Sequence, residues 1–159
     1  IPEVSSSRRK RVPMGFIGPE VLCSNKVRLI PNASLYHYGV LQSGFHNAWI
    51  KNVSGRLKDD YSYSANIVYN NYVWPTPTET QREEIERCAQ AVLGARISQK
   101  DATLADMYDP KNETFFPDLM EAHHKLDEAV ENAYGVNFGG DEEKIVAHLF
   151  KLYASTAER

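Results

Sequence analysis

Apolar residues recur at helical spacing after Ser34, which has the side chain of an N-cap. The apolar positions return every three or four residues as far as Val53 and predict one bent helix or two abutting helices. Gly39 and Gly44 are the expected points of bending, and Gly55 is the expected end. The first half of the chain therefore contains a substantial helical unit.

The second half of the chain shows three further helical patterns. Thr78-Glu79-Thr80-Gln81 has the form of a capping box and opens a helix predicted to end near Arg96. Pro117 suits the first position of the next helix, Gly135 suits its end, and Asp141 opens the last one. Short connections between the three helices predict a small bundle, in which Leu126 is buried between the second and the last helix.

The rest of the sequence favours extended structure. Residues 12–17 and 26–30 are strand-like, and we expect them to complete a sheet whose other strands lie outside this chain. Residues 56–77 lack a helical period and predict extended strand and loop. The expected fold class is α+β, mostly α, with short strands and a bent helix on the N-terminal side followed by a small helical bundle. The expected units are residues 1–77 and 78–159.

Length and composition indicate in which cellular compartment the protein is expected and whether it contacts a membrane. The chain has 159 residues, and none of its apolar runs approaches the roughly 20 residues that cross a bilayer. Cys23 and Cys88 form neither a disulfide framework nor a zinc pattern, so a reduced, cytoplasmic location without membrane contact is expected. The start at Ile1, without an initiator Met, indicates a fragment of a longer protein.

Charge is distributed unevenly along the chain. Residues 1–60 carry nine lysines and arginines against four acidic residues, whereas residues 61–159 carry nine against seventeen. A basic segment favours a polyanion as partner, and an acidic one repels it. If nucleic acid binds, it binds the first part. An alternative is that the acidic helical half is a protein-interaction bundle and the basic part only packs against a missing domain.

No catalytic or metal constellation stands out in the sequence. His123 lies four residues before Asp127, but no second pair of ligands accompanies them, so His123 and His124 are better explained as solvated or core-edge residues. Gly139-Gly140 lacks the lysine of a phosphate-binding loop and is followed by three carboxylates. We interpret it as a turn between helices. The expectation is therefore a chain without catalytic or metal-binding residues of its own.

Two segments carry candidate DNA contacts. The basic stretch that contains Arg8, Arg9 and Lys10 has the cations and hydroxyls that suit phosphate groups. Lys58 and Asp60 lie two residues apart in a segment interpreted as extended, so both should project from one face. A lysine donates to guanine and a carboxylate accepts from cytosine N4, so such a pair can read one G·C base pair. Otherwise the alternating charges are a solvated loop.

The same region carries a family resemblance. Residues 55–64 and their continuation through 67–75 resemble the end of the target-recognition domain in MmeI-like DNA methyltransferases and restriction-modification enzymes. Further segments are similar to this family in the same order, namely residues 5–9, 13–16, 24–31, 35–39, 104–110, 122–130 and 149–153. The resemblance covers essentially the whole chain, which makes it more specific than any one motif.

The resemblance implies a parent enzyme that transfers a methyl group from S-adenosylmethionine to adenine N6 in a specific DNA site. It implies that the cofactor and catalytic motifs lie upstream of Ile1, so this chain reads double-stranded DNA beside the methyltransferase domain of its parent and binds no cofactor itself. It also implies that Lys58 and Asp60 read bases. The candidate DNA contacts further include Arg56, Tyr61 and Tyr63.

One position departs from the resemblance. Where members of the family have Arg before the second tyrosine of the Tyr-x-Tyr-Ser run, this chain has Ser62. A serine cannot reach or neutralise a phosphate as an arginine does. The departure removes one phosphate or base contact that the resemblance would allow here and leaves open what replaces it.

Overall fold

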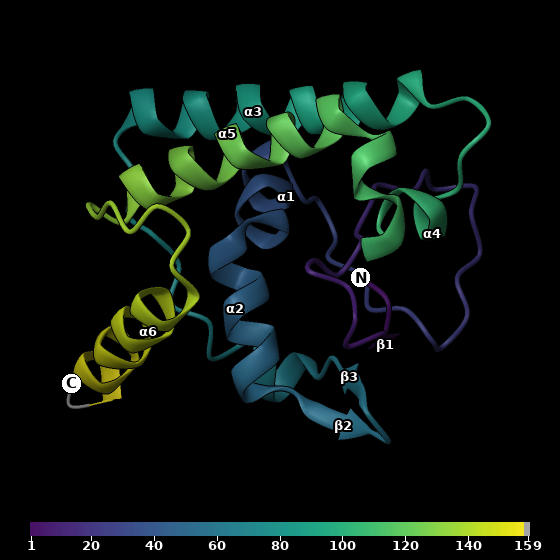
Figure 1. Ribbon diagram of the computed structural model, residues 1–159. Helices are drawn as coiled ribbons and strands as arrows, with labels where there is room; N and C mark the ends of the chain where they lie inside the picture. The colour runs from purple at the N-terminus through teal and green to yellow at the C-terminus, as the bar shows by residue number, and fades with distance from the viewer. Residues whose placement is uncertain (158–159) are drawn as a thin grey trace.

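The computed structural model describes residues 1–157, which form a mostly helical fold with a small three-stranded sheet, as predicted (Figure 1). The helices are α1 (Leu35–Gln42), α2 (Gly44–Val53), α3 (Glu79–Ser98), α4 (Leu104–Met107), α5 (Pro117–Ala133) and α6 (Glu142–Ala157), with a π-helix at Ala65–Tyr69 and a 3-10 helix at Pro110–Phe115. The strands are β1 (Val4–Ser5), β2 (Gly55–Leu57) and β3 (Asp60–Ser62). None of the described helices is long and apolar enough to cross a membrane.

The helical stretch after Ser34 is two helices, with the break at Ser43. Ser43 has extended backbone angles and its hydroxyl accepts from the backbone N–H of His46, so it ends α1 and caps α2. Gly44 begins α2, next to the break, as predicted. Gly39 is not a bend: a Cβ there would lie 2.7 Å from the side chain of Ile85. The missing side chain at Gly39 therefore allows α1 to approach Ile85 of α3 closely.

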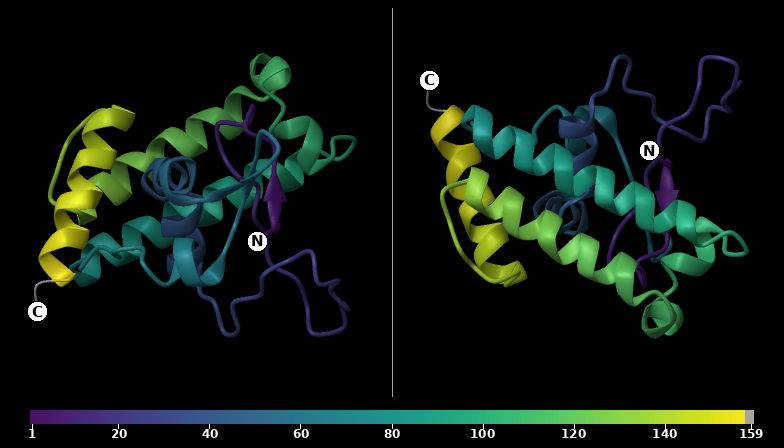
Figure 2. Two further views of the ribbon diagram at one scale, coloured as in Figure 1. Left: turned by 90° about the horizontal axis from the view of Figure 1, so that it is seen from below. Right: turned by 90° about the horizontal axis from the view of Figure 1, so that it is seen from above.

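Helices α3 and α5 pack side by side and cover α1 (Figures 1 and 2). Their predicted starts are confirmed: Thr78 and Gln81 form the capping box of α3, and Pro117 is the first residue of α5. Leu126 is fully buried, as predicted. Its helix, however, packs on α3 and not on the last helix.

The predicted three-helix bundle is wrong because α6 packs against α2. The connection from α5 to α6 contains Gly135, Gly139 and Gly140, all at positive φ, a backbone conformation that glycine adopts without strain. This loop carries the chain away from α3. Helix α6 then lays Phe150 and Tyr153 against Trp49 of α2, at ring distances of 5.4 and 6.0 Å.

Residues 12–17 do not form the predicted strand, although their alternating pattern is real. Val12 and Met14 are buried, as in a strand, but their backbone groups bond to helix side chains. Asn47 Oδ1 accepts from the N–H of Val12 at 2.7 Å, and the Gln42 amide accepts from Met14 N–H and donates to the carbonyl of Val12, both at 3.1 Å. Two helix amides thus replace a neighbouring strand.

The described sheet has three strands of this chain, and residues 12–17 and 26–30 are not among them, contrary to expectation. Its order is β1-β3-β2, both pairs are antiparallel, and β3 is central. Residues 26–30 contribute only one isolated bridge, between Pro2 and Val27. In residues 56–77 extended structure was predicted, and the π-helix was missed. Both predicted units contribute to one hydrophobic cluster, in which Val68 and Leu149 are each fully buried.

Candidate functional site

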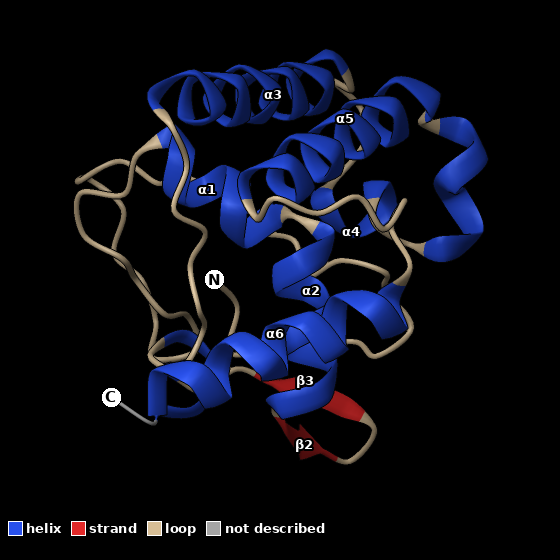
Figure 3. Ribbon diagram, turned by 90° about the vertical axis from the view of Figure 1, so that its left-hand side faces the viewer, coloured by secondary structure: helices blue, strands red, loops and turns tan. Residues whose placement is uncertain are grey.

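Strands β2 and β3 form a hairpin that lies on the opposite side of the molecule from α3 and α5 (Figure 3). Leu57 pairs with Asp60, so the turn consists of Lys58 and Asp59 alone. Lys58 has a φ of 57°, which two-residue hairpin turns require of a central residue. The prediction that Lys58 and Asp60 share a strand face is wrong, since Lys58 is at the tip and only Asp60 is in a strand.

The N-terminal basic segment reaches the same hairpin. Strand β1 pairs with β3, with Ser5 opposite Tyr61, and two residues later the backbone N–H of Ser7 donates to the Asp60 carboxylate at 3.2 Å. Arg8 follows directly and is exposed. The structure thus brings together the two segments that sequence analysis singled out separately.

Three cations of this region are unpaired. Among residues 1–157, the side chains of Arg8, Arg9 and Lys58 have no hydrogen-bond or ion-pair partner. Arg8 and Lys58 are exposed and Arg9 is partly exposed. Free cations at one edge of the fold can neutralise a polyanion without first breaking an internal ion pair.

Tyr61 and Tyr63 lie on the buried side of the hairpin and not on its surface. Tyr61 is opposite Arg56, whose guanidinium stacks on the tyrosine ring at 4.1 Å. Arg56 also donates to the carbonyl of Asp59 at 3.2 Å, which braces the turn. Both tyrosines are buried, so in this structure they pack the hairpin against the body of the fold.

Tyr63 attaches the hairpin to α2 through His46. The Nδ1 atom of His46 lies 2.9 Å from the carbonyl of Leu41, which makes it the protonated nitrogen and leaves Nε2 to accept from the Tyr63 hydroxyl at 3.1 Å. Burial lowers the pKa of His46 to about 4, so the ring is neutral at pH 7. Neither the contact between Tyr63 and His46 nor the contact between His46 and Leu41 has a local signal in the sequence.

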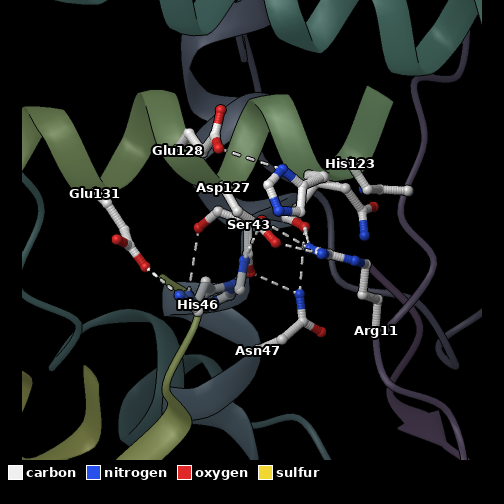
Figure 4. A network of polar contacts seen from close by, with 12 residues as sticks. Arg11, Ser43, His46, Asn47, His123, Asp127, Glu128 and Glu131 are labelled. Atoms are coloured by element: carbon white, nitrogen blue, oxygen red, sulfur yellow. Dashed lines mark hydrogen bonds and ion pairs between the residues drawn. The ribbon is translucent and has the colours of Figure 1, made fainter. Parts of the chain in front are cut away.

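Lys10 and Arg11 are bound to acidic residues of the helical half. Lys10 donates to Glu113 at 2.7 Å. The Arg11 guanidinium forms a two-point ion pair with Asp127 of α5, one contact being 2.9 Å, and Asp127 also accepts from the N–H of Gly44 at 2.8 Å (Figure 4). The basic stretch is therefore divided: Arg8 and Arg9 are free, while Lys10 and Arg11 fix it in place.

Arg96, which sequence analysis missed, is a buried residue that also holds the N-terminal segment in place. It donates to the carbonyl of Met14 at 2.5 Å, to Gln42 at 3.1 Å and to the Tyr108 hydroxyl at 2.8 Å. Tyr108 in turn donates to His123 Nε2 at 2.7 Å. His123 is thus a core residue, and burial together with Arg11 and Arg96 lowers its pKa well below the usual range.

The glycine turn before α6 does bind an anion, but one from the protein. The buried carboxylate of Glu131 accepts from the backbone N–H groups of Phe138, Gly139 and Gly140 at 2.7, 3.1 and 2.8 Å. The turn between helices is confirmed, and its donors are already used. Residues 1–157 contain no group of three or more His, Cys, Asp or Glu side chains that could hold a metal ion.

A cleft of about 470 Å³ lies between the N-terminal segment, α2, α5 and the start of α6. Its lysine and arginine side chains are each paired with a carboxylate, as Lys10 with Glu113, Arg11 with Asp127, and Lys51 with Glu142, while Glu131 is bonded to the glycine turn. The cleft therefore offers no unpaired lysine or arginine among its lining residues. By contrast, the hairpin edge carries three unpaired cations, Arg8, Arg9 and Lys58.

Comparisons with known proteins find similarity along the whole chain. The chain is 41% identical over 160 residues to DNA methyltransferase A of Bacillus subtilis (strain 168), spanning all of this chain and 18% of that protein. A solved structure of the Type IIL restriction-modification enzyme MmeI in complex with DNA superposes with a TM-score of 0.96 and 41% identity over all of this chain and 21% of MmeI. The chain thus spans about a fifth of the length of these relatives.

The family models divide the chain between two domains. The model of the MmeI target recognition domain matches residues 1–76, and that of the MmeI C-terminal domain matches residues 77–158. The hairpin, β1 and the unpaired cations fall in the first match. Arg96 and Asp127, which bind the N-terminal segment, fall in the second. This chain belongs to the MmeI family, with its hairpin in the target recognition domain and helices α3 to α6 in the C-terminal domain.

Proposed function

We propose that this chain recognises a specific double-stranded DNA sequence as part of a longer site-specific DNA methyltransferase of the restriction-modification type, which methylates adenine at N6. The observation that carries the proposal is the meeting of the hairpin tip with the N-terminal basic segment, where Lys58, Arg8 and Arg9 are free cations. The 41% identity to a DNA methyltransferase along the whole chain supports the methyltransferase parent.

The hairpin supplies base recognition in this proposal. A two-stranded ribbon fits the major groove of B-form DNA, and here its tip projects from the helical body (Figure 3). Lys58 at the turn donates to guanine, and Asp60 accepts from the paired cytosine. The contact from Ser7 holds one oxygen of Asp60 and leaves the other oxygen for the base. Ser62 shares a strand face with Asp60, since it lies two residues further along β3.

Arg8 and Arg9 supply phosphate contacts, while the neighbouring residues hold them at the hairpin. Lys10 contacts Glu113, and Arg11 contacts Asp127 of α5. The helical half thus serves as a rigid support for the basic segment. The alternative function, an acidic bundle that only docks another domain, is less well supported because α3 and α5 cover α1 and α6 covers α2.

S-adenosylmethionine would supply the methyl group in the parent enzyme. The described residues do not fit this cofactor: in the 470 Å³ cleft the cations are bonded to carboxylates, and the glycine-turn N–H groups are occupied by Glu131. We propose that cofactor binding and catalysis belong to other parts of the parent chain. Calorimetry of the 159-residue chain with S-adenosylmethionine is expected to give no saturable heat, and a tight signal would contradict this assignment.

The proposed phosphate contacts are tested by salt titration of DNA binding by the full-length enzyme. Replacing Arg8 and Arg9 together by Ala should lower affinity about equally for duplexes with and without the recognition site. It should also reduce the slope of log K against log salt by roughly 1.8, since each phosphate contact contributes about 0.9.

The matched control is Arg87→Ala. Arg87 is an exposed arginine of α3 that pairs with Glu84 on the outer side of the molecule. This variant should leave both the affinity and the salt slope unchanged. An unchanged slope for the Arg8 and Arg9 variant would contradict the proposal that this edge contacts DNA.

A further inference from the structure

Residues 15–31 form a loop that projects beyond the helices beside the N-terminus (Figure 2). Between Gly15 and Pro31 the described structure has no helix, and its only bridge joins Val27 to Pro2. Leu22 is 99% exposed. Four more large apolar side chains of the loop are at least 47% exposed, namely Phe16, Ile17, Val21 and Leu29. Such a concentration of exposed apolar groups typically marks an interaction surface.

A shallow hollow at the base of the loop extends this apolar surface. It has a volume of about 330 Å³ and is lined mainly by apolar and aromatic residues, namely Ile1, Arg28, Leu29, Ile30, Pro31, Tyr63, Ala65 and Tyr69. Ile1 forms part of its wall and is bonded to the loop, since the carbonyl of Ile1 accepts from Arg28 N–H at 2.7 Å. A polypeptide that precedes Ile1 in sequence would therefore join this chain at the edge of the hollow.

We propose that the loop 15–31 and this hollow are the docking surface for the polypeptide that precedes Ile1 in the full-length protein. This chain corresponds to only 18% of its Bacillus relative, and its last 82 matched residues are the family's C-terminal domain. Most of such a protein therefore comes before the part that corresponds to Ile1. The occupant is thus a neighbouring region of the same protein with an apolar face.

The chemistry of the loop favours this occupant over DNA. Its exposed side chains between Phe16 and Leu22 are apolar apart from Glu20, which would repel phosphate. The two cations of the loop, Lys26 and Arg28, lie at its base beside Glu3, with which Arg28 forms an ion pair. The free cations of the proposed DNA contact lie elsewhere, at Arg8, Arg9 and Lys58. The inference does not rest on DNA recognition, so either proposal can fail without the other.

Cys23 offers a direct test because it is exposed and follows Leu22, whereas Cys88 is buried. The full-length enzyme is treated with N-ethylmaleimide, and the peptide that contains Cys23 is followed by mass spectrometry under native and denaturing conditions. The expected result is protection of Cys23 by about 100-fold or more in the native enzyme, because labelling then requires local opening of the interface. Native labelling within about threefold of the denatured rate would overturn the proposal.

Substitutions separate docking from other sources of protection. Leu22→Glu should raise Cys23 labelling at least about tenfold, and Leu22→Met should not, because it keeps the apolar contact. The control Ile97→Glu changes a residue of α3 that is also exposed and should leave Cys23 protected. Protection that is lost on dilution would show a second copy as the occupant, and protection that appears only with DNA would show DNA. Either result would overturn the proposal.

Discussion

Asp127→Ala removes the carboxylate that joins the N-terminal segment, the start of α2 and α5. In the native protein this group holds the Arg11 guanidinium at two points and accepts from the N–H of Gly44. The side chains of Arg11 and Asp127 are only 17% and 23% exposed. Breaking a buried pair costs about 3 to 5 kcal/mol, and partial exposure lowers this figure. With about 1 kcal/mol for the lost Gly44 bond, we expect roughly 2 to 4 kcal/mol.

Urea unfolding of the 159-residue chain measures this loss. Asp127→Asn keeps one acceptor for Gly44 and should cost clearly less than Asp127→Ala. The double variant Arg11→Met with Asp127→Leu removes both charges and should recover part of the loss, because no buried charge is left unpaired. If Asp127→Ala unfolded within about 0.5 kcal/mol of the native chain, the range of ordinary surface substitutions, the argument that α5 fixes the basic segment would be refuted.

Three further outcomes are expected. Leu126→Ala should lower the free energy of unfolding by about 2 to 5 kcal/mol in urea, because Leu126 is fully buried and its removal leaves a cavity; an unchanged midpoint would refute the packing of α5 on α3. Burial lowers the pKa of His46 to about 4, so the unfolded state binds the proton more tightly than the folded state. The free energy of unfolding should therefore be highest above pH 6.5 and fall by about 3 kcal/mol as the pH is lowered to 4. A fall of the same size in His46→Gln would refute this assignment. Tyr63→Phe should weaken DNA binding by the full-length enzyme without altering the salt slope, because Tyr63 positions the hairpin but contacts no phosphate, and a reduced slope would refute that role.

Local signals predicted the helices well. The capping box at Thr78, Pro117 at the start of α5 and Gly135 after its end each act within one helical turn, so they are visible in the sequence. The packing of α6 was not visible in the same way. It depends on where a glycine-rich loop directs the chain and on which apolar face it meets, and α6 meets Trp49 at a distance of about 100 residues in sequence.

The strand predicted at residues 12–17 failed for a physical reason that the sequence conceals. Val12 and Met14 alternate inward, which is the pattern of a strand, but their hydrogen-bond partners are the side-chain amides of Gln42 and Asn47. The hydrophobic pattern indicates which side chains are buried. It does not indicate which groups form hydrogen bonds with the backbone N–H and C=O groups.

The geometry of the candidate site differs from the sequence prediction, and its DNA contacts stay a prediction. Lys58 and Asp60 do lie on an exposed hairpin, but the tight turn gives Lys58 a positive φ and puts it at the tip. Arg11 looked like part of a free basic run, and its partner Asp127 is 116 residues away. Such long-range pairings carry no local signal, so only the structure separates the free cations from the bound ones.

Exchange of the recognition pair tests the central proposal most directly. A full-length enzyme carrying Lys58→Glu with Asp60→Arg is expressed, and its methylated DNA positions are mapped. If Lys58 donates to guanine and Asp60 accepts from its cytosine, the exchange should favour the inverted base pair, by tenfold or more, since each good base contact is worth about 1 to 3 kcal/mol. Thermal unfolding controls for the lost contact between Asp60 and Ser7. An unchanged recognition sequence with uniformly lower activity would contradict base reading by this hairpin.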